Sequence, residues 1–160
     1  GGSMILIEDT RNQIGKHKVL NEQLKALGHT VVRSKLYVGD YAKINDMSVC
    51  IDTKKDWLEL ASNICGKQHA RFRSECERAL ACGVKLIVLV EEQVNLENWT
   101  SPVRKMTGQP ICRVNPITLQ KAMETMTERY NVEFMHCAKD KTAQMIISIL
   151  GGEDGEKKDD

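Results

Sequence analysis

The run VKLIVLVEE at 84–92 constrains the fold more than any other stretch of the sequence. It is apolar from Val84 to Val90 except for one lysine, and it ends in two glutamates. A short run rich in valine and isoleucine predicts a strand. An almost uninterrupted apolar run is typical of a central strand whose two faces are both covered. We therefore expect a sheet built around this segment.

Strands and helices are expected to alternate along the rest of the chain. Apolar runs predict strands at 4–9, 47–54 and 132–137, and an extended segment at 29–44 that turns near Gly39. Helical periodicity predicts helices at 14–27, 55–64, 68–83, 115–130 and 139–150. This alternation implies an α/β domain with a mixed central sheet flanked by helices.

Capping signals support several of these helix boundaries. Asn115 is suited to be an N-cap, with Pro116 at the first helical position. Gly28 and Gly151 are expected to end the first and the last helix.

Composition indicates one folded domain with a small basic excess. The chain has 160 residues, of which 41% are hydrophobic, enough for a single core. Residues 1–3, Gly-Gly-Ser, resemble a cloning remnant; residues 4–151 are the expected domain, and 152–160 an expected disordered polar tail. Without the five acids and two lysines of 151–160, the chain carries 21 basic and 17 acidic side chains. That excess permits binding to nucleic acid.

The cysteines and the hydropathy pattern favour an intracellular protein. No pair of cysteines has C-x-x-C spacing. This absence favours reduced thiols in the cytoplasm, or in the nucleus if the source is eukaryotic. The six cysteines are Cys50, Cys65, Cys76, Cys82, Cys112 and Cys137. No segment is long and apolar enough for a signal peptide or a membrane span. The four histidines share no spacing, so we do not expect zinc.

Three acidic residues fall at or just after the ends of expected strands. They are Asp9, Asp40 and Asp52. Ligand and catalytic groups gather at strand ends in α/β sheets, and converging carboxylates suit Mg²⁺ or Mn²⁺. Lys54 lies two residues after Asp52, hence on the same strand face, where it could orient or help to deprotonate a water. Such a set fits phosphodiester hydrolysis.

Spacing alone leaves simpler interpretations open. In a chain with 22 acidic residues, some fall at strand ends by chance, and a solvated strand end is then the commoner explanation. Basic residues gather on one helix face at 67–78 and in the long loop at 95–114. They are either solvated surface or phosphate contacts: Lys67, His69, Arg71, Arg73, Arg78, Arg104, Lys105 and Arg113.

Five segments in a fixed order carry a family resemblance: ILIEDTRN, LYVGDYAKI, SVCIDTKKDWLELASNI, QHARFRSECERAL and VKLIVLVEE. Together they resemble the nuclease domain of XPF-type structure-specific endonucleases, the XPF, Mus and Hef group of the restriction-endonuclease-like superfamily. The resemblance covers about 4–92 motif by motif. It implies a restriction-endonuclease-like fold, a mixed central sheet with helices on both faces. It also implies a metal-dependent DNA endonuclease acting at branched or flap DNA in repair or recombination.

The resemblance also implies roles for single residues. Asp9, Asp40 and Asp52 would hold Mg²⁺ or Mn²⁺, and Lys54 would serve the nucleophilic water. Predicted phosphate or DNA contacts are Arg11, Lys67, Arg71 and Arg73. The family further implies a homodimer or heterodimer through the C-terminal helices, with DNA as the other partner.

Four positions depart from the family pattern. Residues 52–54 read Asp-Thr-Lys where the family has Glu-Arg-Lys. Asn12 replaces the acid of the D-x-R-E segment, and Leu58 replaces an acid four residues after the lysine. These losses motivate an alternative, a catalytically decayed nuclease-fold module that binds DNA or a partner protein. An inhibitor or adaptor for another protein is a third hypothesis.

Overall fold

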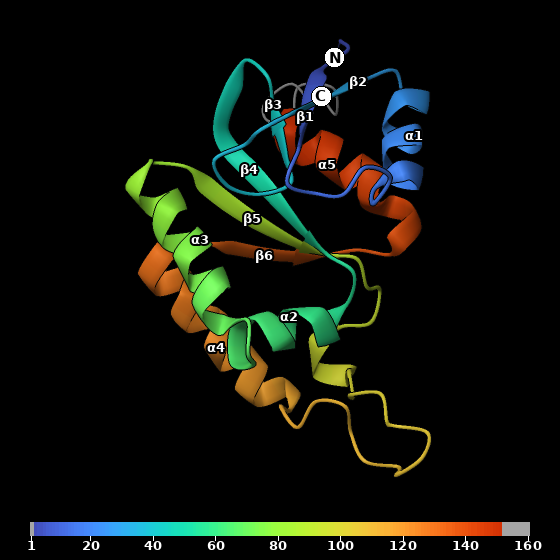
Figure 1. Ribbon diagram of the computed structural model, residues 1–160, viewed down its shortest axis with the longest axis vertical. Coiled ribbons are helices and arrows are strands. Elements are labelled where there is room, and N and C mark those ends of the chain that lie inside the picture. The colour runs from blue at the N-terminus through green and yellow to red at the C-terminus, as the bar shows by residue number, and fades with distance from the viewer. Residues whose placement is uncertain (1, 152–160) are drawn as a thin grey trace, which may run out of the picture.

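The computed structural model describes residues 2–151, so the tail expected at 152–160 lies outside the described residues. The sheet of the described part has six strands (Figure 1). Their spatial order is β2 (Thr30–Ser34), β1 (Ile5–Asp9), β3 (Tyr41–Lys43), β4 (Asp46–Lys54), β5 (Lys85–Val90) and β6 (Glu133–His136). Strand β3 is antiparallel to both neighbours, and the other pairs are parallel. The predicted mixed sheet is confirmed.

Helices cover both faces of this sheet, as predicted. In Figure 1, α1 (Lys18–Ala26) and α5 (Thr142–Gly151) lie on one side. The other side carries α2 (Trp57–Cys65), α3 (His69–Ala81) and α4 (Pro116–Tyr130). No helix in the described part of the chain is long and apolar enough to cross a membrane.

Strand alternation divides the core into two hydrophobic clusters. Cys50 of β4 packs with the cluster beneath α2, α3 and α4, whereas its neighbour Ile51 packs with the cluster beneath α1 and α5. In β5, Val88 and Leu89 divide in the same way. Strand β5 is therefore covered on both faces, as its uninterrupted apolar sequence predicts.

Helix α1 begins later than the sequence pattern predicts. Gly15 has φ +89°, a left-handed conformation that a right-handed helix cannot include. Ile14 is consequently 88% exposed, and Val19 is also exposed. Only Leu20 and Leu24 carry the buried stripe. The predicted start of this helix is wrong because one glycine turns the chain before it.

The remaining helix boundaries agree more closely with the capping signals. The Asn115 side chain accepts a hydrogen bond from the backbone N–H of Thr118 at 2.8 Å, and Pro116 begins α4. Gly28 has φ +94° just after α1, as expected for a helix end. Helix α5 follows a short 3₁₀ turn at 139–141 and extends to Gly151, the last described residue.

The turn predicted at Gly39 places Asp40 immediately before β3. Gly39 has φ +78°, and a Cβ there would lie 3.0 Å from the Ile51 carbonyl oxygen and 3.2 Å from Cβ of Cys50. The Asp40 N–H donates to the Ile51 carbonyl at 2.7 Å. The backbone of this turn therefore lies directly against β4, and only glycine fits.

We expect Gly39→Ala to destabilise the fold strongly. Alanine in a left-handed conformation costs roughly 1–2 kcal/mol, and crowding against β4 adds about 1–3 kcal/mol. Gly28→Ala is the matched control, because Gly28 has φ +94° and a Cβ added there would meet no atom within 4 Å. Urea unfolding of both variants measures the difference. Equal losses would show that the contacts with β4 contribute nothing.

Candidate active site

All four predicted catalytic residues line one cleft of about 440 Å³. Asp9 comes from the end of β1, Asp40 immediately precedes β3, and Asp52 and Lys54 come from the end of β4. Strand ends that are far apart in the sequence therefore meet at one edge of the sheet. A larger hollow of about 710 Å³ between α4 and β6 contains none of the residues predicted from the sequence.

The predicted phosphate contacts separate into two groups. Arg11 and Arg71 line the cleft, and so does Arg78 of α3. Lys67 instead lines a neighbouring hollow, and Arg73 lies on the exposed surface of α3, 3.7 Å from Glu77. Residues 71 and 78 are seven positions apart and share a helix face, whereas residue 73 points about 200° away from residue 71.

Asp9 is held by internal partners. Its side chain is 3% exposed; Oδ1 accepts from the Leu36 N–H at 2.8 Å, and Oδ2 is 2.6 Å from Nε of Arg11. Arg11 also donates to the Leu36 carbonyl at 2.9 Å. Asp9 and Arg11 thus tie the loop after β1 to residue 36, and the role of Asp9 as a metal ligand stays a prediction.

Asp40 has donors on both carboxylate oxygens. Oδ1 accepts from Nδ2 of Asn12 at 3.0 Å, and Oδ2 accepts from the N–H and the Oγ1 of Thr53 at 2.8 and 2.9 Å. Burial raises the pKa of Asp40, but the donors Thr53 and Asn12 outweigh burial and the net pKa is lowered. Asp40 is therefore ionised, and two departures from the family pattern, Asn12 and Thr53, hold it in place.

Asp52 is a buried carboxylate whose charged form the cleft disfavours. Its Oδ2 is buried without a hydrogen bond of good geometry, although Nζ of Lys54 lies 3.1 Å away, so the contact is an ion pair. Burial, then the negative charges of Glu75 and Asp40, raise the pKa of Asp52 well above its ordinary value despite Lys54.

Lys54 is the cation beside these carboxylates. Its Nζ also donates to Oδ1 of Asn63 at 3.1 Å and lies 5.3 Å from the centre of the Phe72 ring. Burial opposes its charge, but Asp52 and Glu75 outweigh burial and raise the pKa of Lys54. Lys54 is therefore an ammonium group that donates hydrogen bonds.

Glu75 of α3 also belongs to the cleft, although the sequence pattern did not single it out. Its Oε2 accepts from the N–H of Gly39 at 3.1 Å, and it is the leading charge that raises the pKa of Asp52. The sequence did hold a signal, because Glu75 follows Arg71 by four residues and so shares its helix face.

The donor chemistry fits a divalent cation. Within residues 2–151 no three His, Cys, Asp or Glu side chains lie close enough together to hold a metal by themselves. Magnesium, however, is commonly held by one or two carboxylates, with waters and substrate phosphates completing its shell. The Oδ2 of Asp52 is buried with only the Lys54 ammonium beside it, and the pKa of Asp52 remains raised, so a further positive charge beside Asp52 and Asp40 would be favourable.

Comparisons with known proteins agree with the α/β fold. The sequence model of the ERCC4 domain matches residues 8–149, and the chain belongs to this family of nuclease domains. No curated protein sequence is significantly similar to it.

Several solved chains share the fold, among them two structures of an XPF protein. The first is XPF from Aeropyrum pernix in complex with DNA; its sequence is 21% identical to this chain and its TM-score is 0.64. The match covers 92% of this chain and 63% of the XPF chain. The structure described as XPF from Aeropyrum pernix is 20% identical with a TM-score of 0.63, covering 91% and 63%. This chain thus spans less than two thirds of either relative, and the XPF-type resemblance is confirmed.

Proposed function

We propose that this chain is a metal-dependent DNA endonuclease that hydrolyses phosphodiester bonds, with branched and flap DNA as the first substrates to test. The observation that carries the proposal is the Asp52–Lys54 ion pair beside Asp40 in a cleft that arginines also line. Membership of the ERCC4 family supports nuclease chemistry. An intracellular role in DNA repair or recombination would follow. Free thiols at all six cysteines are compatible with a reducing compartment.

The residues of the cleft divide the chemical work. Asp40 and Asp52, with Asp9 as the third predicted ligand, would hold Mg²⁺ or Mn²⁺, which supplies positive charge to the scissile phosphate. Lys54 orients the attacking water and stabilises negative charge in the transition state, because its raised pKa keeps it protonated. Arg71 and Arg78, which line the same cleft, would bind the phosphates of the substrate.

A cleavage assay tests this proposal. Labelled duplex, single-stranded, flap and four-way-junction DNA would be incubated with Mg²⁺, Mn²⁺ or EDTA. We expect cutting that needs the metal. Intact DNA in every lane, with binding retained, would favour the decayed-site alternative that Asn12 and Thr53 motivate. Intact DNA without binding at low salt would favour the adaptor hypothesis.

A comparison of Arg71 with Arg73 tests which face of α3 contacts DNA. Arg71→Ala should weaken binding and reduce the slope of log K against log salt by about one, because one phosphate contact is lost. Arg73→Ala is the matched control, since Arg73 lies two residues away on the same helix but outside the cleft. Fluorescence anisotropy at several salt concentrations measures both. Equal slopes for the two variants would remove Arg71 from the DNA contact.

Dimerisation through the C-terminal helices α4 and α5 stays a prediction. Among the exposed large hydrophobic residues of the described chain, only Ile117 comes from these helices. Sedimentation velocity with and without DNA tests this pairing directly.

A further inference from the structure

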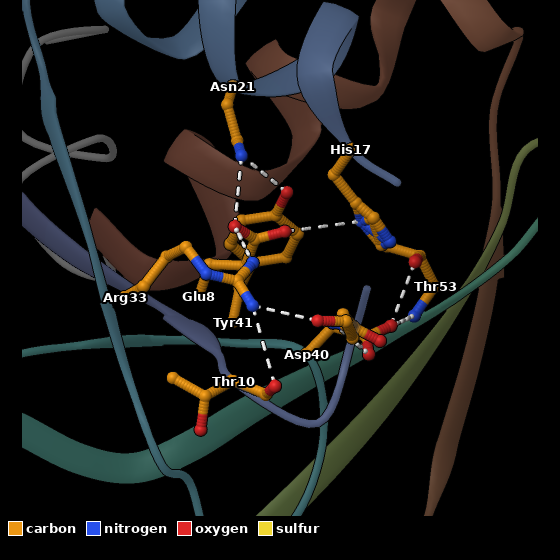
Figure 2. A network of polar contacts seen from close by, with 9 residues as sticks. Glu8, Thr10, His17, Asn21, Arg33, Asp40, Tyr41 and Thr53 are labelled. Atoms are coloured by element: carbon orange, nitrogen blue, oxygen red, sulfur yellow. Dashed lines mark hydrogen bonds and ion pairs between the residues drawn. The ribbon is translucent and has the colours of Figure 1, made fainter. Parts of the chain in front are cut away.

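Strand β1 carries a second acid that faces away from the cleft. Glu8 precedes Asp9, so the two side chains lie on opposite faces of the strand. Glu8 is 1% exposed, and its Oε1 accepts from Nη1 of Arg33 at 2.9 Å and from Nδ2 of Asn21 at 3.1 Å. The Tyr41 hydroxyl donates to Oδ1 of Asn21 at 2.6 Å. Figure 2 shows this buried network.

Arg33 connects the buried acid to the loop after β1. It lies opposite Glu8 in the register of β1 and β2. Its second terminal nitrogen, Nη2, donates to the carbonyl of Asn12 at 2.7 Å and approaches the carbonyl of Thr10 at 3.4 Å. One planar guanidinium therefore makes two separate contacts, which a lysine ammonium cannot reproduce with the same geometry.

The loop in turn contacts the cleft. The backbone carbonyl of Asn12 is held by Arg33, and its side-chain Nδ2 donates to Oδ1 of Asp40. The same loop is also held by Arg11, which contacts Asp9 and the Leu36 carbonyl, and by the Thr10 N–H, which donates to the Ser34 carbonyl at 3.3 Å. A continuous path of hydrogen bonds thus runs from Glu8 through Arg33 and Asn12 to the Asp40 carboxylate.

We infer that Arg33, anchored by Glu8, is a positioning residue that acts through Asn12 to aim the Asp40 carboxylate into the cleft. Both oxygens of Asp40 have a fixed donor, so the carboxylate keeps one orientation and its remaining lone pairs stay available to a cation. Partners that orient a metal-binding carboxylate typically change metal affinity about 10–100-fold when lost. The inference rests on the proposed function for its metal readout only.

A double-mutant cycle tests the path from Arg33 to Asn12. Arg33→Lys keeps a positive charge beside Glu8 but not the fork, and we expect it to weaken Mn²⁺ binding about tenfold. Asn12→Ala should produce a similar loss. In the Asn12→Ala background, Arg33→Lys should then add little, because both changes break the same path. Isothermal titration measures the four affinities, and Arg129→Ala, an exposed arginine of α4, is the control expected to leave them unchanged.

A second readout needs neither metal nor cleavage. In metal-free protein, the NMR signal of the Asn12 side-chain amide should move toward that of a free amide in Arg33→Lys and stay in place in Arg129→Ala. An unchanged Asn12 signal, or losses of Mn²⁺ affinity that add fully in the double variant, would overturn the inference. If the wild type neither binds Mn²⁺ nor cuts DNA, the proposed function fails, and the amide signal alone then decides whether Arg33 acts through Asn12.

Discussion

Asp52→Asn is expected to abolish metal-dependent cleavage and, in metal-free buffer at neutral pH, to stabilise the fold. Burial, Glu75 and Asp40 disfavour the charged carboxylate, so the neutral amide removes an unfavourable interaction. Lys54 keeps Glu75 and Glu59 as compensating charges. We expect a gain on the order of 1 kcal/mol, which raises Tm by about 2–4 °C in a chain of this size.

The pH dependence has a definite sign. The folded pKa of Asp52 lies above the unfolded value of 3.8, so the folded state binds this proton more tightly than the unfolded state. The stability contributed by Asp52 is therefore complete below about pH 4 and is lost as pH rises through the folded pKa. The Tm advantage of Asp52→Asn should accordingly be small at pH 4 and grow toward pH 8.

Thermal melts in EDTA across this pH range measure the effect. Glu77→Gln is the control, since Glu77 lies on the outer surface of α3 and should change neither Tm nor cleavage. A lower Tm for Asp52→Asn at neutral pH would contradict the electrostatic account of the cleft.

Lys54→Met is expected to destabilise the fold, in contrast to Asp52→Asn, and to reduce DNA cleavage strongly. Methionine has a similar length and can pack beside the Phe72 ring, but it removes the ammonium that lies near Asp52 and Glu75. Breaking a buried ion pair in this way costs about 3–5 kcal/mol. Loss of a group that assists proton transfer or orients the nucleophile costs roughly 10²–10⁴-fold in rate.

Urea unfolding at pH 7 and single-turnover cleavage measure the two effects of Lys54→Met. The stability deficit should shrink as pH falls, because Asp52, whose pKa is raised, takes up a proton. The double variant Asp52→Asn/Lys54→Met should be more stable than Lys54→Met alone. If the double variant is the less stable one, the two side chains do not form the pair that the structure indicates.

Much of the fold could be predicted from local patterns. The uninterrupted apolar run that forms β5, and the i, i+2 spacing that puts Asp52 and Lys54 on one face of β4, require only the geometry of a strand. Asp9 and Asp40 could be predicted to approach Asp52 because each falls at or just after the end of an expected strand, and all three residues line the same cleft. Helical geometry also contained the answer for α3, where Arg71 and Glu75 share a face and Arg73 does not.

The amino-acid sequence alone therefore determined which elements form and which side chains emerge at their ends, because these properties follow from periods of a few residues. Only the tertiary structure decided which side-chain and carbonyl oxygen atoms accept hydrogen bonds from other parts of the chain. Asp9 is satisfied by the N–H of Leu36, Asp40 by Asn12 and Thr53, and Asn12 by Arg33. These partners lie between 13 and 28 positions apart in the chain, and no local period relates them, because packing of the sheet brings them within hydrogen-bonding distance.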